Sequence, residues 1–338
     1  MPKDNENIPF LGPVEPSEPL GFPAEQMIRC EECLRANPPT RVSCLYCVAP
    51  LPLTESSARL RKPVLRQPEK HQLGYNNILL PMEGVATEVI NDAAALVKLS
   101  AENVQQLLSQ SVPMPVARTA SREEAELVTL RLRDLGLKCV TISDEELGSS
   151  NVVKRVRAMS FEDDERVVIY HSGTEETEIS WSDLILFLTA RLIETTVEIK
   201  ERMTRKKENE IIDTTELFRD EMVIDFYMTA HPFTWRVGAT GFDFSCLGSE
   251  KALVANENIN RLQKVIVAKA VKAQFDDSYQ RVRNLLELAW STQPETQSSG
   301  WRRERPGKLS VGIATTKSNE SQFTRYSRLR RFLILNRS

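Results

Sequence analysis

Four cysteines near the N-terminus have the type and the spacing that hold a metal ion. Cys30, Cys33, Cys44 and Cys47 form two C-x2-C pairs with ten residues between them. A C-x2-C turn brings two thiolates to the same side of a loop, so two turns can direct four sulfurs at one tetrahedral ion. Because cysteine fills all four positions, none is left for water or substrate, which predicts a structural Zn²⁺.

Two other uses of these cysteines compete with a metal site. Disulfides need an oxidising compartment, and Met1 to Gly12 lacks the basic start and apolar run of a secretion signal. A redox C-x2-C opens a helix in a βαβ unit, whereas Pro38 and Pro39 lie between the pairs here. Structural zinc is therefore the favoured interpretation.

The cysteine cluster resembles a zinc ribbon over residues 28–50. The segment has hardly any apolar core, so metal binding is expected to supply most of its folding free energy. Zinc ribbons serve transcription, translation and protein docking alike, so the resemblance implies the metal and leaves the partner open.

The composition of the chain excludes several classes of protein. Its 338 residues suffice for two or three domains. With 44 basic and 47 acidic residues, the chain is neither a polycation nor a strongly acidic chain. Apolar runs such as Leu184 to Leu188 are far too short to cross a bilayer. We therefore expect a cytoplasmic protein without a membrane partner.

Residues that could support catalysis are scarce. Three histidines and thirteen glycines leave little for a histidine-based site or a phosphate-binding loop. Cys139 and Cys246 each lie apart from the other cysteines in the sequence. A lone cysteine is more often a small buried residue than a nucleophile. The sequence favours binding over catalysis, since an enzyme would need one pocket that gathers groups such as His171, His231, Asp225 and Cys246.

The predicted fold class is a multidomain α+β protein. It consists of a small zinc ribbon, a small α/β-sandwich domain, and a larger, mainly antiparallel sheet with covering helices. The predicted segments are a disordered arm at 1–27, the zinc-ribbon-like module at 28–50, a linker at 51–75, an α+β domain at 76–147, an α+β domain of unknown type at 152–290, and a basic segment at 291–338.

The residue pattern of 76–147 predicts the element order strand, helix, helix, proline loop, helix, strand. Ser100 is an N-cap candidate, Pro113 and Pro115 form the loop, and Ser121 with Glu124 matches a capping box. Apolar residues recur at helical spacing between these boundaries.

This order is similar to the C-terminal domain of the bacterial ribosomal stalk protein and to the related adaptor of the Clp protease. The matching positions are Val89, Ile90, Leu99, Leu107, Leu108, the helix start SREEAE, Leu132, Leu135, Gly136 and Val140. The resemblance implies the fold and a general role in protein docking. The basic residues with which the stalk domain binds translation factors are replaced by Asn91, Ala94 and Glu102, and the adaptor's acidic loop keeps only Glu83.

The region from Val152 predicts a mainly antiparallel sheet. A helix is expected at Trp181 to Ile193, and two later helices, marked by Leu262 and Leu286, are expected to cover one face. The expected strands are Val167 to Tyr170, Ile179 to Trp181, Thr196 to Met203, Met222 to Met228 and Phe233 to Phe244.

The chain ends in a segment with ten basic and two acidic residues after Gly300. Aromatic residues lie between its arginines, as in surfaces that stack bases and neutralise phosphates, although such a tail can also pack against its own acidic chain. The candidate phosphate-binding residues are Arg302, Arg303, Arg305, Arg325, Arg328, Arg330 and Arg331. We expect a zinc-binding adaptor or scaffold that docks proteins, with a nucleic-acid or ribosome-associated protein as the alternative.

Overall fold

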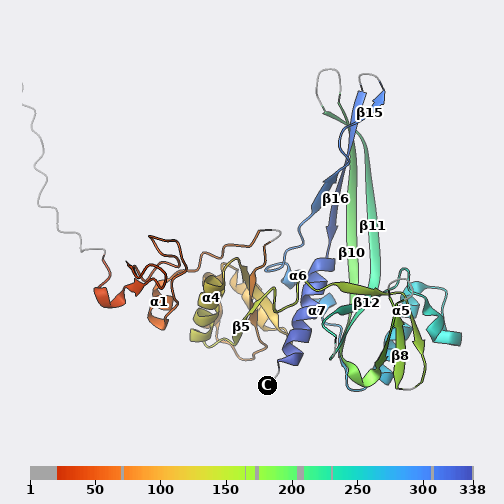
Figure 1. The fold of residues 1–338 in the computed structure, drawn as a ribbon, viewed down its shortest axis with the longest axis horizontal. Helices are drawn as coiled ribbons and strands as arrows, with labels where there is room; N and C mark the ends of the chain where they lie inside the picture. The colour runs from red at the N-terminus through yellow and green to blue at the C-terminus, as the bar shows by residue number, and fades with distance from the viewer. Residues whose placement is uncertain are drawn as a thin grey trace, which may run out of the picture. The chain divides into compact units, whose positions relative to one another are not determined.

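The chain forms two compact units, Met1–Val64 and Leu65–Ser338, named here the smaller unit and the larger unit. The computed structural model describes residues 21–69, 72–163, 165–171, 175–203, 209–229, 231–305 and 308–336 (Figure 1). Helices and several separate sheets confirm the predicted α+β class. Most of the predicted arm at 1–27 lies outside the described residues, and its described end contains a short 3-10 helix, η1 (Ala24–Gln26).

The smaller unit has little regular structure. Strand β1 (Ile28–Arg29) pairs antiparallel with β2 (Ala36–Asn37). Among the described residues its hydrophobic cluster consists of Ile28, Cys30, Cys44 and Leu51. Two of these four residues are cysteines, so the stability of this unit depends on what their sulfurs bind.

Part of the predicted linker at 51–75 is ordered within the smaller unit. Helix α1 (Glu55–Leu60) begins at a capping box in which Thr54 and Ser57 bond each other's backbone N–H groups. Arg61 follows the helix, is buried, and donates to three backbone carbonyls. These are the carbonyls of Pro39 (3.0 Å), Leu51 (3.4 Å) and Pro52 (3.1 Å).

The larger unit begins with a small antiparallel sheet of order β4-β3-β5. Its elements are β3 (Tyr75–Leu79), α2 (Thr87–Val97), α3 (Ala101–Leu108), β4 (Met114–Thr119), α4 (Arg122–Asp134) and β5 (Cys139–Ser143). The predicted proline loop holds only for Pro113, which lies between α3 and β4; Pro115 lies within strand β4. Strand β4 is at the edge of the sheet, where a residue without an N–H is tolerated.

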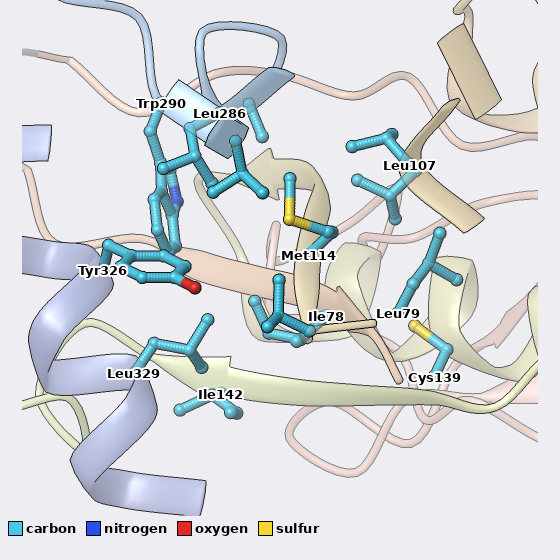
Figure 2. Close-up of a cluster of buried hydrophobic side chains, with 14 of the residues drawn as sticks. Ile78, Leu79, Leu107, Met114, Cys139, Ile142, Leu286, Trp290, Tyr326 and Leu329 are labelled. Carbon is cyan, nitrogen blue, oxygen red and sulfur yellow. The ribbon is translucent and has the colours of Figure 1, made fainter. Parts of the chain in front are cut away.

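Both faces of this small sheet are covered. On one face, Asn77 donates to the Ala125 carbonyl (2.7 Å) and the Thr129 hydroxyl (2.9 Å) of α4. On the other, the indole N–H of Trp290 donates to the side chain of Asn76 (2.8 Å). Figure 2 shows Ile78 and Ile142 of the sheet in one cluster with Trp290, Leu286, Tyr326 and Leu329. One core therefore includes residues of the predicted segments 76–147, 152–290 and 291–338. The boundaries between these segments remain predictions.

A second, larger sheet has the order β14-β16-β10-β11-β12-β6, with β13 paired to β10 and β15 paired to β16. Most of its neighbours are antiparallel, as predicted; β13 with β10 and β12 with β6 are parallel. A separate antiparallel sheet contains β7 (Ala158–Phe161), β8 (Arg166–Tyr170) and β9 (Glu176–Ser180). The strands of the larger sheet are β6 (Val153–Val156), β10 (Leu184–Met203), β11 (Asn209–Met228), β12 (Thr234–Gly238), β13 (Gln274–Asp276), β14 (Glu295–Ser298), β15 (Arg302–Arg305) and β16 (Lys308–Ser318).

The helix predicted at Trp181 to Ile193 is wrong. Only a 3-10 turn, η2 (Trp181–Asp183), precedes β10. Leu186 and Leu188 are buried in one hydrophobic core and Phe187 in another, on the opposite face. A strand that is buried on both faces has a continuous apolar run, which periodicity alone does not distinguish from a buried helix.

The later helices cover opposite faces of the sheet, not one face. Helix α5 (Ala255–Lys269) packs in the core that contains Phe187, whereas α6 (Tyr279–Leu286) and α7 (Glu320–Leu335) pack in the core that contains Leu186. The predicted strand at Phe233 to Phe244 also ends early, at Gly238 in β12. There the Thr240 N–H donates to the Glu221 carboxylate (2.8 Å), and the chain turns towards η3 (Phe244–Glu250).

Candidate metal centre

The two C-x2-C pairs adopt the same backbone turn. In the first, Cys30 N–H donates to the Arg35 carbonyl (3.0 Å), and Leu34 N–H donates to the Cys30 carbonyl (2.9 Å). In the second, Cys44 N–H donates to the Ala49 carbonyl (2.8 Å), and Val48 N–H donates to the Cys44 carbonyl (3.1 Å). These two turns, named here the knuckles, point both thiols of each pair in one direction.

The four sulfurs of Cys30, Cys33, Cys44 and Cys47 lie within 4.8 Å of one another. The Sγ atoms of Cys30 and Cys47 are 3.5 Å apart, as are those of Cys33 and Cys44. A tetrahedral ion with bonds of about 2.3 Å to sulfur separates its ligands by about 3.8 Å. The observed spacing fits one such ion and is too wide for the predicted alternative, a disulfide of about 2.05 Å.

Hydrogen bonds make Cys44 a good thiolate ligand. Burial raises its pKa, but bonds from the backbone of Tyr46 and Cys47 and from the Asn37 amide outweigh this and lower the pKa to about 6. For Cys47 a backbone bond from Ala49 lowers the pKa, whereas desolvation and bonds to the other three thiols raise it to about 12. A cation bound between the sulfurs would favour the thiolate form of Cys47 as well.

Asn37 joins the two knuckles and was missed by the sequence analysis. It is fully buried, donates to the Arg35 carbonyl (2.9 Å) and the Cys44 sulfur (3.4 Å), and accepts from Leu45 N–H (2.8 Å). The preference of asparagine for turns was the only local sign of this role.

Each knuckle carries exposed apolar side chains next to its cysteines in the sequence. We name Leu34, Leu45, Tyr46 and Val48 the knuckle patch, and each of them is more than half exposed. Leu34 (φ 59°) and Val48 (φ 64°) follow the second cysteine of each pair in the left-handed region. That conformation favours glycine and is strained for a β-branched residue such as Val48.

The two other cysteines lie far from this arrangement in the chain, and their pKa values are raised. Burial raises the pKa of Cys139 and of Cys246 to about 11 each. Both side chains pack with apolar neighbours in the larger unit. Cys139 is buried, as the sequence predicts, whereas Cys246 is only partly buried.

The candidate phosphate-binding arginines of α7 are engaged by their own chain. Their contacts are Arg325 with Asp144 (3.8 Å) and the Trp290 ring, Arg328 with the Asn151 carbonyl, Arg330 with Asp276 (2.8 Å), and Arg331 with the His231 carbonyl (3.3 Å) and the Tyr227 ring. Arg302 is exposed on β15, and the side chains of Arg303 and Arg305 lie outside the described residues. This geometry favours the alternative in which basic residues pack against the chain's own polar groups.

The groups that a catalytic pocket would need lie on opposite faces of the larger sheet. Asp225 forms a two-point ion pair with Arg236 (2.6 and 2.8 Å) on the face covered by α7. His171 lies against the ring of Trp235 (5.0 Å between centroids), and neighbouring residues of a strand point to opposite faces. The structure therefore places Asp225 and His171 on opposite faces of the larger sheet.

Comparisons with protein-family models, curated proteins and solved structures give no match to this chain. No helix among the described residues is long and apolar enough to span a membrane.

Proposed function

We propose that this protein is a docking protein, an adaptor or scaffold, whose smaller unit is held together by one structural Zn²⁺. The observation that carries the proposal is the pair of knuckles: their four sulfurs lie together, and apolar side chains of the same knuckles are exposed. A site whose four ligands are all cysteines has no open position for a substrate. Its role is therefore to hold the smaller unit in one conformation and so to present a surface.

Zinc fits these ligands best among common metals. Four thiolates in tetrahedral geometry select Zn²⁺ or iron, and zinc has no redox chemistry that would damage exposed thiolates. Bound zinc would supply four bonds that replace a hydrophobic core. The need for reduced thiols supports a reducing compartment such as the cytoplasm.

The strained backbone of the knuckle patch supports a docking role. Leu34 and Val48 are 66% and 76% exposed, so burial does not offset the cost of their left-handed conformation. Apolar side chains that stay this exposed gain little from burial within the fold. They do suit contact with a partner protein, where such side chains become buried.

The small sheet of the larger unit supports the same role. Apart from strand β4, which lies where a loop was predicted, its element order is the one for which the stalk-domain resemblance was stated, and that resemblance implies protein docking. One of its two sheet faces is already occupied by α6 and α7 of the same chain. A partner would therefore have to contact its helices.

The test is capture of partners by the zinc-loaded full chain from extract of its own cells, with and without nuclease. The double variant Leu45→Ser/Val48→Ser removes two apolar side chains of the knuckle patch. The matched control, Leu253→Ser, removes a fully exposed apolar side chain of the larger unit. Atomic emission should give one zinc per chain for all three proteins.

We expect the wild type and the control to capture the same proteins with or without nuclease. Capture by the double variant should fall at least tenfold, as expected for the loss of two contact residues. Undiminished capture by the double variant would refute docking by the knuckle patch. Loss of all capture after nuclease treatment would instead favour the nucleic-acid alternative, with Arg302 as an exposed candidate contact.

A further inference from the structure

Part of the larger sheet lies beyond both hydrophobic cores. The cores include β10 up to Leu192 and β11 from Met222 onwards. The remaining residues, Ile193–Met203 and Asn209–Glu221, pair with each other and on one side with β16. We name this part the sheet arm; it is the long hairpin labelled β10 and β11 in Figure 1.

One edge of the sheet arm is unpaired. On that side β12 pairs only with Val223–Phe226 of β11, and no other strand of the described chain joins β11 there. On the opposite side, β16 pairs with β10 along the arm, and β14 and β15 pair with β16. The free edge is Asn209–Asp220, about 40 Å of extended chain at about 3.4 Å per residue.

The register identifies which backbone groups face outwards. The Met222 carbonyl accepts from Ala239 N–H (2.9 Å), so residue 222 points its hydrogen-bonding groups away from β10. Pairing between β10 and β11 is regular from Tyr227 back to Asp213, and the direction alternates along a strand. Thr214, Glu216, Phe218 and Asp220 therefore present N–H and C=O groups at the free edge.

This edge lacks the usual protection against pairing. Residues 209–221 contain no proline, glycine or lysine. Within the arm the register shifts only near the tip, where Ile212 of β11 is an extra residue between the pairs Lys200–Asp213 and Glu201–Ile211, so the edge is regular from Asp213 to Asp220. Leu217 and Phe218 are 51% and 66% exposed. A long, regular edge with exposed apolar side chains is a template for another strand.

The charge of the edge indicates the kind of strand. Asp220 pairs with Arg191, and Glu221 with Arg155 (3.1 Å). Asp213 and Glu216 are exposed, and the contacts of the described residues include no cationic partner for either. A second copy of β11 would bring like charges together, which destabilises strand pairing.

We propose that the free edge of β11 binds an extended, basic segment of a partner protein by strand addition. The partner's backbone pairs with Thr214, Glu216 and Phe218, its basic side chains lie opposite Asp213 and Glu216, and its apolar side chains lie opposite Leu217 and Phe218. This edge is on the larger unit and does not depend on the zinc-held knuckles, so it adds a second docking surface.

The probe is a fluorescein-labelled peptide, Thr-Val-Val-Lys-Thr-Thr-Lys-Val-Thr. Paired antiparallel, it places its two lysines opposite Glu216 and Asp213 and its first two valines opposite Phe218 and Leu217. The control peptide has glutamate in place of both lysines. Fluorescence anisotropy with the zinc-loaded full chain should give at least tenfold tighter binding of the lysine peptide.

Two substitutions at one position separate the backbone from the charge. Glu216→Pro removes an outward N–H and leaves the bonds to β10 in place, as proline does on an edge strand. Glu216→Ala removes the charge and keeps the N–H. We expect Glu216→Pro to weaken binding at least tenfold and Glu216→Ala about threefold, with circular dichroism showing that both variants fold.

Charge reversal gives an independent readout. In Asp213→Lys/Glu216→Lys the preference should switch from the lysine peptide to the glutamate peptide. The proposal is overturned if the wild type binds neither peptide, if Glu216→Pro binds like Glu216→Ala, or if light scattering shows that β11 pairs two copies of the chain instead. Cys44→Ser should keep peptide binding, which distinguishes this edge from the knuckle patch.

Discussion

The smaller and the larger unit place their apolar side chains differently. In the smaller unit the buried cluster is Ile28, Cys30, Cys44 and Leu51, while the four residues of the knuckle patch are exposed. In the larger unit, two extensive cores bury residues from both faces of one sheet. On the proposed function, zinc would replace a core in the smaller unit and leave its apolar side chains available for a surface.

Replacing a ligand gives the largest expected difference between the units. Cys44→Ser should unfold the smaller unit, because structural zinc contributes on the order of 10 kcal/mol to such modules at neutral pH. The larger unit should be unaffected. Heteronuclear NMR checks both at once: signals of residues 21–64 should collapse to unfolded positions while those of the larger unit stay.

The control for this prediction is Cys139→Ser, which alters a buried thiol of the larger unit and leaves the zinc content unchanged. A Cys44→Ser protein that keeps dispersed signals from residues 21–64 would contradict the comparison. The four-residue cluster would then suffice to fold the smaller unit.

The second largest effect concerns a buried ion pair of the larger unit. Arg236 binds Asp225, Glu320 (2.8 Å) and Thr324 (2.9 Å), and Asp225 also accepts from Ser327 (2.9 Å). Arg236→Met leaves the fully buried Asp225 without a counter-charge, so we expect a loss of about 3–5 kcal/mol in urea unfolding. The double variant Arg236→Met/Asp225→Leu should regain much of this loss, and an equally unstable double variant would disprove the explanation.

These contacts show which features the sequence could predict. The four ligands lie in two pairs of close neighbours, and helix α4 begins at Ser121, whose side chain accepts from Glu124 N–H as predicted. In both cases the physical cause acts within a few residues. The sequence also predicted the antiparallel character of the larger sheet, from turn and alternation patterns.

Features decided by distant residues were not predictable in this way. Glu124 does not complete its capping box, because its carboxylate accepts from the backbone of Leu65 and Arg66. Arg61 and Trp290 likewise find partners far away in the sequence. The apolar run at the start of β10 is buried against a core on each face of the sheet. Distant residues form these cores, so the local periodicity of the run does not distinguish a strand from a helix.

A smaller effect, seen only in acid, is expected at Asp144, where the small sheet meets α7. Burial raises the pKa of Asp144, but the hydrogen bond from Arg118, the charge of Arg325 and the Asn76 amide outweigh this and lower it. A lowered pKa stabilises the fold above the ordinary value of about 3.9, and this contribution is lost as the pH falls through the folded pKa.

The variant Asp144→Asn isolates this contribution. It should cost about 2 kcal/mol at pH 7, typical of hydrogen bonds to a charged group, and the gap to the wild type should close as the pH falls below about 4. Urea unfolding of the larger unit at several pH values measures the gap. A gap that stays constant from pH 7 to pH 3 would show that the Asp144 charge is not involved.

The smallest effect has the opposite sign and tests whether the knuckle patch exists for folding or for docking. Val48→Gly relieves a left-handed conformation that costs a β-branched residue about 1–2 kcal/mol, while the extra freedom of glycine in the unfolded chain offsets about 0.5–1 kcal/mol. Zinc should therefore be held more tightly, by up to about tenfold in competition with a chelator, while partner capture weakens. If Val48→Gly instead held zinc less tightly, the Val48 side chain would stabilise the fold of the smaller unit. Its apolar side chains would then serve folding, as those of the larger unit do.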